Sequence, residues 1–401
     1  MTPVELSRTV LHAVRRAVDA GQLTVSVPER AVVAPPGPGG CGDYATTIAL
    51  QLARPAGRTP RYVAEVLRPY LLDADHVADV VLTGPGFLNI SLHRTAPADL
   101  VRRILVLGPR YGHRAPDPAA GHAPTARLHC APEPRALVVL DAAARLLRSQ
   151  GAVVRTSCDA PPGAGWSRVL GVHVDAVGPP PEGPDVTLVR PVPAACDDPV
   201  RLGDLTSLGR SAGRWALLLP AAHDRPHLDD EQRRAHLVQH ERNPLFRVRY
   251  AHARTRALVR NAADLGFTAD PAALTAPAPG PASLTGHASH TRPASLTGHT
   301  SPTGHASHTI PAATNPPALL ASLADHPRVL AAAAAQRAPD RLARHLVTVA
   351  EVTLPFLPTV LPRGAEKPSA AHRARLALAE AAGTVLAGGL SLLGIDAPDH
   401  L

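Results

Sequence analysis

Lysine and aromatic residues are the side chains of which this sequence has least. The 401 residues include one lysine, Lys367, and aromatic residues make up only 3% of the chain. No site upstream of Lys367 can therefore use a lysine side chain. Hydrophobic residues still make up 45% of the sequence, so we expect cores built from Ala, Leu and Val.

Cysteine clusters and long apolar runs are missing as well. The four cysteines (Cys41, Cys130, Cys158 and Cys196) lie far apart and form no Cys-x-x-Cys pair, so no zinc or redox motif is encoded locally. No apolar run is long enough to span a bilayer, and residues 1–20 are charged and amphipathic, unlike a signal peptide. We therefore expect no metal, no membrane and a cytoplasmic location.

Positive charge is what the sequence has in excess. The net charge is +8, which suits a polyanionic partner such as nucleic acid, although the arginine-rich composition alone produces the same sign. A length of 401 residues leaves room for two or three domains.

One stretch, residues 243–260, combines helix signals with this charge. Asn243 can cap the first N–H groups of a helix, and Pro244 fits its first turn. Leu245, Val248 and His252 follow helical spacing and predict a packed face. Two aromatic residues and five arginines predict a cationic surface that binds unpaired RNA bases and phosphates, although an ordinary solvated helix is the alternative. These residues are Phe246, Tyr250, Arg247, Arg249, Arg254, Arg256 and Arg260.

Three motifs then point to one family. Asn243-Pro244 followed by Tyr250-Ala-His-Ala-Arg254 resembles the opening of the anticodon-binding (DALR) domain of arginyl-tRNA synthetases. Residues 42–46 (Gly-Asp-Tyr-Ala-Thr) and 84–89 (Gly-Pro-Gly-Phe-Leu-Asn) are similar to marker motifs of the N-terminal tRNA-binding domain of that family. The last ten residues, 392–401, also resemble the end of the family's chains.

The resemblance implies two sets of RNA contacts. Phe87 and Asn89 match family residues at which the tRNA elbow docks. An exposed Phe can stack on a splayed base, and Asn offers both a donor and an acceptor to a base edge. The alternative is that Phe87 lies in the core and Asn89 caps a strand end. On the anticodon side the resemblance implies four residues: Arg247, Tyr250, Arg254 and Arg256.

The family's ATP-binding motifs have no match. Class I synthetases place His-Ile-Gly-His between the first strand and helix of the catalytic domain, where this chain has Ala131-Pro-Glu-Pro-Arg135, and Glu133 would repel phosphate. His129, on the preceding strand, is interpreted as structural. The region 186–202, which matches the Lys-Met-Ser-Lys loop, contains no lysine. Its arginines, Arg190 and Arg201, could copy the charge but not a loop built from two lysines. Only 27 residues separate Cys158 from Val186, too few for the family's catalytic centre.

The predicted fold class is mixed. We expect α+β and α/β N-terminal parts, a remnant of a class I Rossmann-like catalytic domain in the middle, and an all-α DALR helical bundle at the end. Pro-Ala-Ser-Leu-Thr-Gly-His occurs twice within a low-complexity stretch that cannot bury a core, and this stretch is expected to be a disordered insert. The predicted segments are 1–106 (N-terminal tRNA-binding domain), 107–126 (linker), 127–202 (truncated Rossmann-like remnant), 203–401 (stem and DALR domain) and 271–316 (insert within it).

These observations predict a tRNA-binding paralogue of arginyl-tRNA synthetase, with arginine tRNA as partner, that has lost the adenylate-forming site. Such a pseudoenzyme has no catalytic residues and no cofactor. One alternative is residual arginine–tRNA ligase activity, with aminoacylation that requires ATP. The other is a protein-interaction module that no longer binds RNA.

Overall fold

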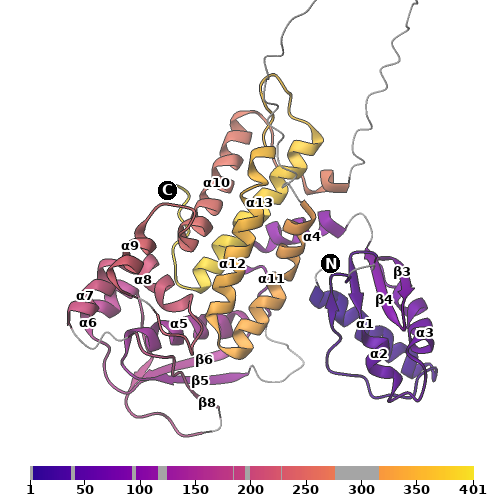
Figure 1. Cartoon of the computed structure of the whole chain (residues 1–401), viewed down its shortest axis with the longest axis horizontal. Helices are drawn as coiled ribbons and strands as arrows, with labels where there is room; N and C mark the ends of the chain where they lie inside the picture. The colour runs from indigo at the N-terminus through magenta and orange to yellow at the C-terminus, as the bar shows by residue number, and fades with distance from the viewer. Residues whose placement is uncertain are drawn as a thin grey trace, which may run out of the picture.

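Two separate hydrophobic cores organise the computed structural model. The structure describes residues 3–37, 41–92, 96–115, 124–183, 185–194, 199–226, 228–275 and 316–401. The first core draws its buried residues from Leu6 to Ile90, and the second from Leu100 to Ile395. Figure 1 shows the first core as an indigo unit beside the larger body of the molecule. We call these parts the N-terminal unit and the main body.

An antiparallel sheet and three helices form the N-terminal unit, which confirms the mixed α and β composition expected there. The strand order is β1-β2-β4-β3, and apolar side chains of the helices fill the core. The elements are α1 (Pro3–Asp19), β1 (Val33–Ala34), β2 (Tyr44–Thr46), α2 (Ile48–Ala53), α3 (Pro60–Leu72), β3 (Val77–Thr83) and β4 (Phe87–Leu92).

A tight hairpin joins β3 to β4. Gly84 and Gly86 have φ values of 54° and 146°, in the region that favours glycine. A Cβ on Gly86 would lie 2.9 Å from Pro60 at the start of α3, so this glycine also lets the hairpin pack against the helix. Because Thr83 pairs with Phe87 across the ladder, Phe87 lies at the tip of the hairpin.

A four-stranded parallel sheet, with strand order β7-β6-β5-β8, lies at one end of the main body (Figure 1). Its centre is β5 (Thr125–Cys130), α5 (Pro134–Ser149) and β6 (Val153–Cys158), which form a parallel β-α-β unit within the region expected to be Rossmann-like. Short elements complete this region: α6 (Ala164–Leu170), β7 (Ala176–Val177) and β8 (Val186–Leu188).

The remainder of the main body is helical, as predicted. The helix that begins at Asn243-Pro244 is α10 (Pro244–Asp264), which packs against α12 (Pro339–Thr353) and α13 (Ala370–Leu392). Gly383 permits the close approach of α10 and α13, because a Cβ there would overlap the Thr255 hydroxyl. The other elements are α4 (Ala96–Leu107), η1 (Gly108–Arg110), α7 (Pro199–Ser207), α8 (Gly209–Leu218), α9 (Asp230–Leu237), η3 (Pro271–Thr275), α11 (Pro316–Gln336) and η4 (Leu357–Thr359).

Two fully buried arginines tie the sheet region to the helices. The guanidinium of Arg135 donates to five backbone carbonyl groups between Val192 and Asp224. Arg214 donates to the Leu393 carbonyl at 2.8 Å and to the Asp141 carboxylate at 2.6 Å. Burial lowers the pKa of both arginines, although the Asp141 carboxylate acts in the opposite direction at Arg214. The sheet region is therefore held rigidly against the bundle.

The observed elements cross several predicted boundaries. Helix α4 continues through Leu107, η1 follows it, and β5 already begins at Thr125, so much of the expected 107–126 linker is structured; residues 116–123 lie outside the described residues. Helix α7 crosses the expected division at 202/203. The first five residues of the expected insert form η3, which packs against α4 and α13, while the repeats lie outside the described residues.

Within the described ranges, no helix is both long enough and apolar enough to cross a membrane.

Candidate nucleic-acid interface

Helix α10 begins as its sequence predicts. The side-chain oxygen of Asn243 accepts the N–H groups of Leu245 and Phe246 at 3.1 and 3.4 Å. Its amide nitrogen donates to the carbonyl groups of His236 and Val238 at 2.8 and 3.0 Å, so the cap also fixes the loop that precedes the helix. The predicted packed face is buried, and α10 is thereby a rigid support for the side chains on its other faces.

One exposed face of α10 carries an aromatic pair and an arginine. Tyr250 stacks on Phe246, with ring centroids 5.4 Å apart and planes at 14°, and remains 38% exposed. Arg254 lies one turn further along, is exposed, and makes no hydrogen bond or ion pair within the described part of the chain. A groove of about 250 Å³ runs beside these residues, and its opposite wall comes from Leu354, Leu357 and Pro358. We call it the aromatic groove.

Arg247 belongs to the wall of the aromatic groove and is held in place. Its guanidinium donates to the Glu241 carbonyl at 3.0 and 2.6 Å and pairs with the Glu351 carboxylate on α12. Only about a quarter of the side chain is exposed, at 24%. Its charge is therefore largely used within the protein, in contrast to that of Arg254.

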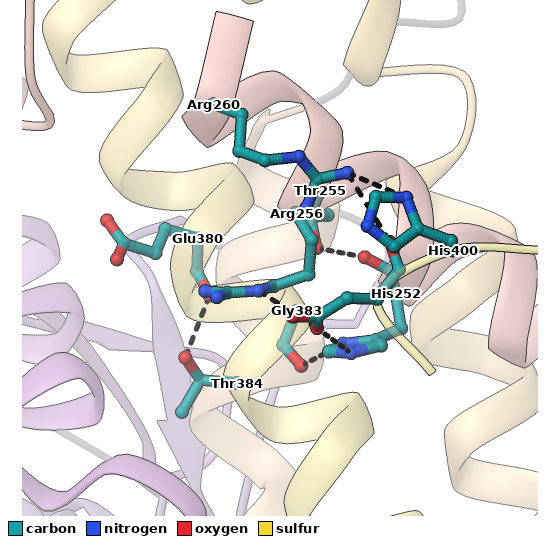
Figure 2. Close-up of polar contacts among 9 residues, drawn as sticks. His252, Thr255, Arg256, Arg260, Glu380, Gly383, Thr384 and His400 are labelled. Carbon is teal, nitrogen blue, oxygen red and sulfur yellow. Dashed lines mark hydrogen bonds and ion pairs between the residues drawn. The ribbon is translucent and has the colours of Figure 1, made fainter. Parts of the chain in front are cut away.

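Arg256 lies on a different face of the same helix, so the single cationic surface expected from the sequence is two surfaces. Residues two positions apart are turned by about 200° around a helix axis. The Arg256 guanidinium donates to the Asp399 carboxylate at 3.2 Å, and His252 lies 3.5 Å from the same carboxylate. Figure 2 shows Arg256, Arg260 and His400 gathered where α10 meets α13 and the C-terminal segment.

The groove at this second face measures about 320 Å³ and is lined mainly by α10, α13 and the C-terminal segment. The Nδ1–H of His252 donates to the Gly383 carbonyl at 3.1 Å. Burial lowers the pKa of His252, although Asp399 and that hydrogen bond act in the opposite direction. The two arginines of the second face, Arg256 and Arg260, are thus already bonded to groups of the C-terminal segment.

The hairpin of the N-terminal unit separates the two residues expected at the tRNA elbow. Phe87 is 37% exposed at the hairpin tip, where its ring is accessible for stacking. Asn89 is only 2% exposed. Its amide nitrogen donates to the Val81 carbonyl at 3.3 Å and to the Thr83 hydroxyl at 2.7 Å. In this conformation Asn89 supports the hairpin and presents no free edge to a base.

A carboxylate occupies the start of α5, where the family motif would lie. Glu133 caps this helix: one oxygen accepts the Ala136 N–H at 2.7 Å, and the other accepts the Ala194 N–H at 3.0 Å. His129 lies within 2.9 Å of both the Ser157 hydroxyl and the Asp159 carboxylate, a bonding pattern in keeping with the structural role expected for it.

No contact of the described residues brings the two arginines expected to copy the lysine charge to the start of α5. Arg190 is exposed, and the side chain of Arg201 lies outside the described residues. No group of three potential metal ligands comes together in the described ranges.

Sequence reasoning missed the acidic partners of α10. Glu351 and Asp399 decide which arginines are neutralised, yet they lie 104 and 143 residues away from Arg247 and Arg256. The groove wall at Leu354–Pro358 was missed for the same reason. No local pattern around these residues signals that they face α10.

Two family models match the ends of the chain. The model described as arginyl tRNA synthetase N terminal domain matches residues 5–92, and the one described as DALR anticodon binding domain matches residues 288–401. The first range contains the Phe87 hairpin. The second contains α12 and α13 but begins after α10.

Curated relatives match part of the chain. The arginine–tRNA ligase of Renibacterium salmoninarum is 42% identical over 166 residues, which is 38% of this chain and 30% of that protein. The Frankia alni arginine–tRNA ligase is 44% identical over 115 residues, 29% of this chain and 21% of that protein. The match therefore spans less than a third of these relatives' length.

Solved structures share the fold. The Thermus thermophilus arginyl-tRNA synthetase superimposes with a TM-score of 0.58 at 16% identity, covering 100% of both chains. The Plasmodium falciparum arginyl-tRNA synthetase gives 0.62 at 8% identity, covering 100% of this chain and 99% of that one. The chain thus shares the fold of these two structures, with a mixed α and β N-terminal region followed by a helical DALR domain. It is an arginyl-tRNA synthetase-related protein.

Proposed function

We propose that this protein binds tRNA, with arginine tRNA as the expected partner, and does not activate an amino acid. The observation that carries the first half is the aromatic groove. It offers an exposed stacked ring, Tyr250, beside Arg254, whose guanidinium has no bonding partner among the described residues. Aromatic faces bind unstacked bases, and guanidinium groups bind phosphate, so the pair suits a single-stranded RNA loop.

Phe87 is proposed as the second contact, on the N-terminal unit. It is exposed at the end of a hairpin that is fixed by Gly86 and by the hydrogen bonds of Asn89. A rigid hairpin reduces the entropy lost when its ring stacks on a base. In this proposal Asn89 acts through the hairpin rather than on the RNA.

The second half of the proposal rests on Glu133. A phosphate group at the start of a helix is stabilised by free N–H groups and by the helix dipole. At α5 a fixed carboxylate already accepts the Ala136 N–H, and the only lysine lies far along the chain at position 367. These residues do not fit an ATP triphosphate, because a negative charge stands where the phosphates would be bound.

Filter binding of total tRNA over a range of salt concentrations tests the first half. We expect affinity to fall steeply with salt, because each phosphate contact contributes roughly 0.7 to 0.9 to the slope of log affinity against log salt. Absence of salt-dependent binding in a folded sample would overturn tRNA binding and favour a protein-interaction role.

ATP–pyrophosphate exchange with arginine, with and without tRNA, tests the second half. We expect no exchange above a heat-killed control. Exchange above that control would show that adenylate chemistry survives, and the arginine–tRNA ligase alternative would then replace the proposal.

A further inference from the structure

The side chain of Asp399 lies against the second, cationic face of α10. Its Oδ1 atom accepts the Nε–H of Arg256 at 3.2 Å and lies 3.5 Å from Nε2 of His252. One turn further along the helix, Nη2 of Arg260 lies 3.4 Å from the Asp399 carbonyl oxygen. Figure 2 shows how these groups of α10 face α13 and the C-terminal segment. Asp399 is therefore placed where an external anion would contact the same three groups.

Few contacts hold Asp399 in this place. The side chains of Asp399 and Arg256 are 50% and 44% exposed, and an exposed ion pair changes an equilibrium by at most about fivefold. The Nδ1–H of His252 is donated to the Gly383 carbonyl, so a neutral His252 has no proton on Nε2 to donate to the carboxylate. Asp399 is thus a loosely bound occupant that another anion can displace.

Most of the Arg256 guanidinium is not used by Asp399. An arginine side chain has five N–H donors, and only the Nε–H of Arg256 makes a hydrogen bond within the described part of the chain. In contrast, the Arg328 guanidinium holds Asp325 with two nitrogen atoms, at 2.5 and 2.6 Å. Guanidinium groups bind phosphate in this bidentate way, through parallel N–H groups. The terminal N–H groups of Arg256 can therefore bind a phosphate once Asp399 has moved.

A groove beside this cluster provides room for a ligand. It measures about 320 Å³, and Arg256, Val259, Thr384 and Asp399 are among its lining residues. Small-molecule sites begin at about 300 Å³, so a phosphate-sized group fits within this volume. Helices α10 and α13, which approach closely at Gly383, form the fixed walls. Displacement of Asp399 moves the C-terminal segment and leaves these helices in place.

The cluster gains a net positive charge when Asp399 leaves it. Glu380 is the other carboxylate that lines the groove, and it is half-buried. With Asp399 in place, Arg256 and Arg260 face two carboxylates. Without it, the two arginines face Glu380 alone. The vacated cluster therefore favours an anion.

We propose that Arg256 and Arg260, beside His252, form a phosphate-binding site in which Asp399 is the internal substitute for the anion. The ligand is a phosphate group, either of an RNA backbone or of a free polyphosphate. While Asp399 is in place it masks the site, and RNA contact on α10 is confined to the aromatic groove on the other face. The RNA form of the ligand rests on the proposed tRNA binding, whereas the site itself does not.

Isothermal titration of inorganic pyrophosphate into the full chain tests the site without RNA. Asp399→Asn removes the charge of the occupant and keeps its shape, so we expect pyrophosphate to bind more tightly than to the parent by about fivefold. This factor corresponds to the removal of one like charge at about 4 Å in water. Adding Arg256→Ala to Asp399→Asn should abolish the gain. The matched control is Asp396→Asn, which removes the same charge from the same segment, where Asp396 accepts the Ser211 hydroxyl at 3.5 Å.

Filter binding of tRNA over a range of salt concentrations tests the RNA form of the ligand. We expect Asp399→Asn to steepen the slope of log affinity against log salt by roughly 0.7 to 0.9 for each phosphate that Arg256 and Arg260 then contact. The variant that also carries Arg256→Ala should lose one such step, and Asp396→Asn should keep the slope of the parent. Thermal melts of the same samples check that the exposed substitutions leave the fold intact.

Equal effects of Asp399→Asn and Asp396→Asn on both ligands would overturn the site, because net charge alone would then explain them. A gain that persists after Arg256→Ala is added would overturn it as well. A gain for pyrophosphate with no tRNA binding in any variant would support the site and overturn the proposed tRNA binding. Binding of tRNA to the parent, with no gain for either ligand in Asp399→Asn, would do the reverse. A gain for one ligand alone supports the site and identifies the source of the phosphate.

Discussion

The ring of Tyr250 lies parallel to that of Phe246, at a centroid distance of 5.4 Å and an interplanar angle of 14°. Phe246 is partly covered by the main body, whereas Tyr250 is exposed on its outer side. The inner ring therefore orients the outer one, and a base that stacks on Tyr250 would extend an existing stack. Tyr250 is therefore a surface residue whose outer face is open to a ligand.

Changing Tyr250 to Ala should weaken tRNA binding by about 1–3 kcal/mol, because the stacking surface is lost. The salt slope should stay nearly constant, since no phosphate contact is removed. Tyr250→Phe keeps the ring and is the control, for which we expect near-native affinity. Binding and melting must be measured on one sample. A large fall in melting temperature would show that Tyr250 acts through stability instead.

Two of the exposed arginines of α10, Arg254 and Arg256, provide a matched pair of variants. Arg254→Ala should flatten the slope of log affinity against log salt by roughly 0.7 to 0.9, because Arg254 is free to contact phosphate. Arg256→Ala removes the same charge from the same helix, but its guanidinium is bound to Asp399 on the other face. It should leave the slope nearly unchanged. Equal flattening in both variants would mean that net charge, rather than the aromatic groove, sets the affinity.

Local patterns predicted the elements of this fold, and long-range contacts decided the roles of side chains. The Asn243 cap, the packed stripe of α10 and the β-α-β unit around α5 all follow from neighbours within a few residues. The division of α10 into two faces could also have been predicted from its helical period. The ion pair of Arg256 could not have been predicted in this way, because its partner Asp399 lies 143 residues away.

The roles of the buried polar residues could not be predicted from local sequence patterns either. Asn89 stands in a motif that suggests an exposed contact, yet its partners across the hairpin, Val81 and Thr83, hold it inside. His326 and His345 lie on ordinary amphipathic helices, and nothing in either helix indicates that their rings lie together or that Tyr111 stacks on His326. Such assignments depend on which helices pack together, which spacing along one helix does not specify.

Phe87 and Asn89 should respond differently to alanine. Phe87→Ala should lower tRNA affinity by about 1–3 kcal/mol with little change in melting temperature, because the ring is exposed. Asn89→Ala removes hydrogen bonds to Val81 and Thr83 and should destabilise the N-terminal unit by about 1–3 kcal/mol. Thermal melts and filter binding of both variants provide the comparison. A stable Asn89→Ala variant with weakened binding would restore a direct RNA contact for Asn89.

The last prediction concerns Arg135, which lies two residues after Glu133 at the position where the family motif would begin its helix. Changing Arg135 to Met keeps most of the side-chain volume but leaves five carbonyl groups between Val192 and Asp224 without their donor. Each unsatisfied buried acceptor costs about 1–3 kcal/mol, and neighbouring groups relax only in part, so we expect a total loss of about 3 kcal/mol or more. For a body of this size that corresponds to a fall in melting temperature of roughly 6 °C or more.

The matched control is Arg155→Met, which changes an exposed arginine on β6 and should melt within about 1–2 °C of the parent. If Arg135→Met melts with the control, the sheet region is not held by this arginine. Arg135→Lys separates the charge from the guanidinium group, because lysine carries three N–H donors against the five of arginine. If Arg135→Met lowers the melting temperature and Arg135→Lys restores only part of it, the guanidinium group is what joins the sheet to the helices.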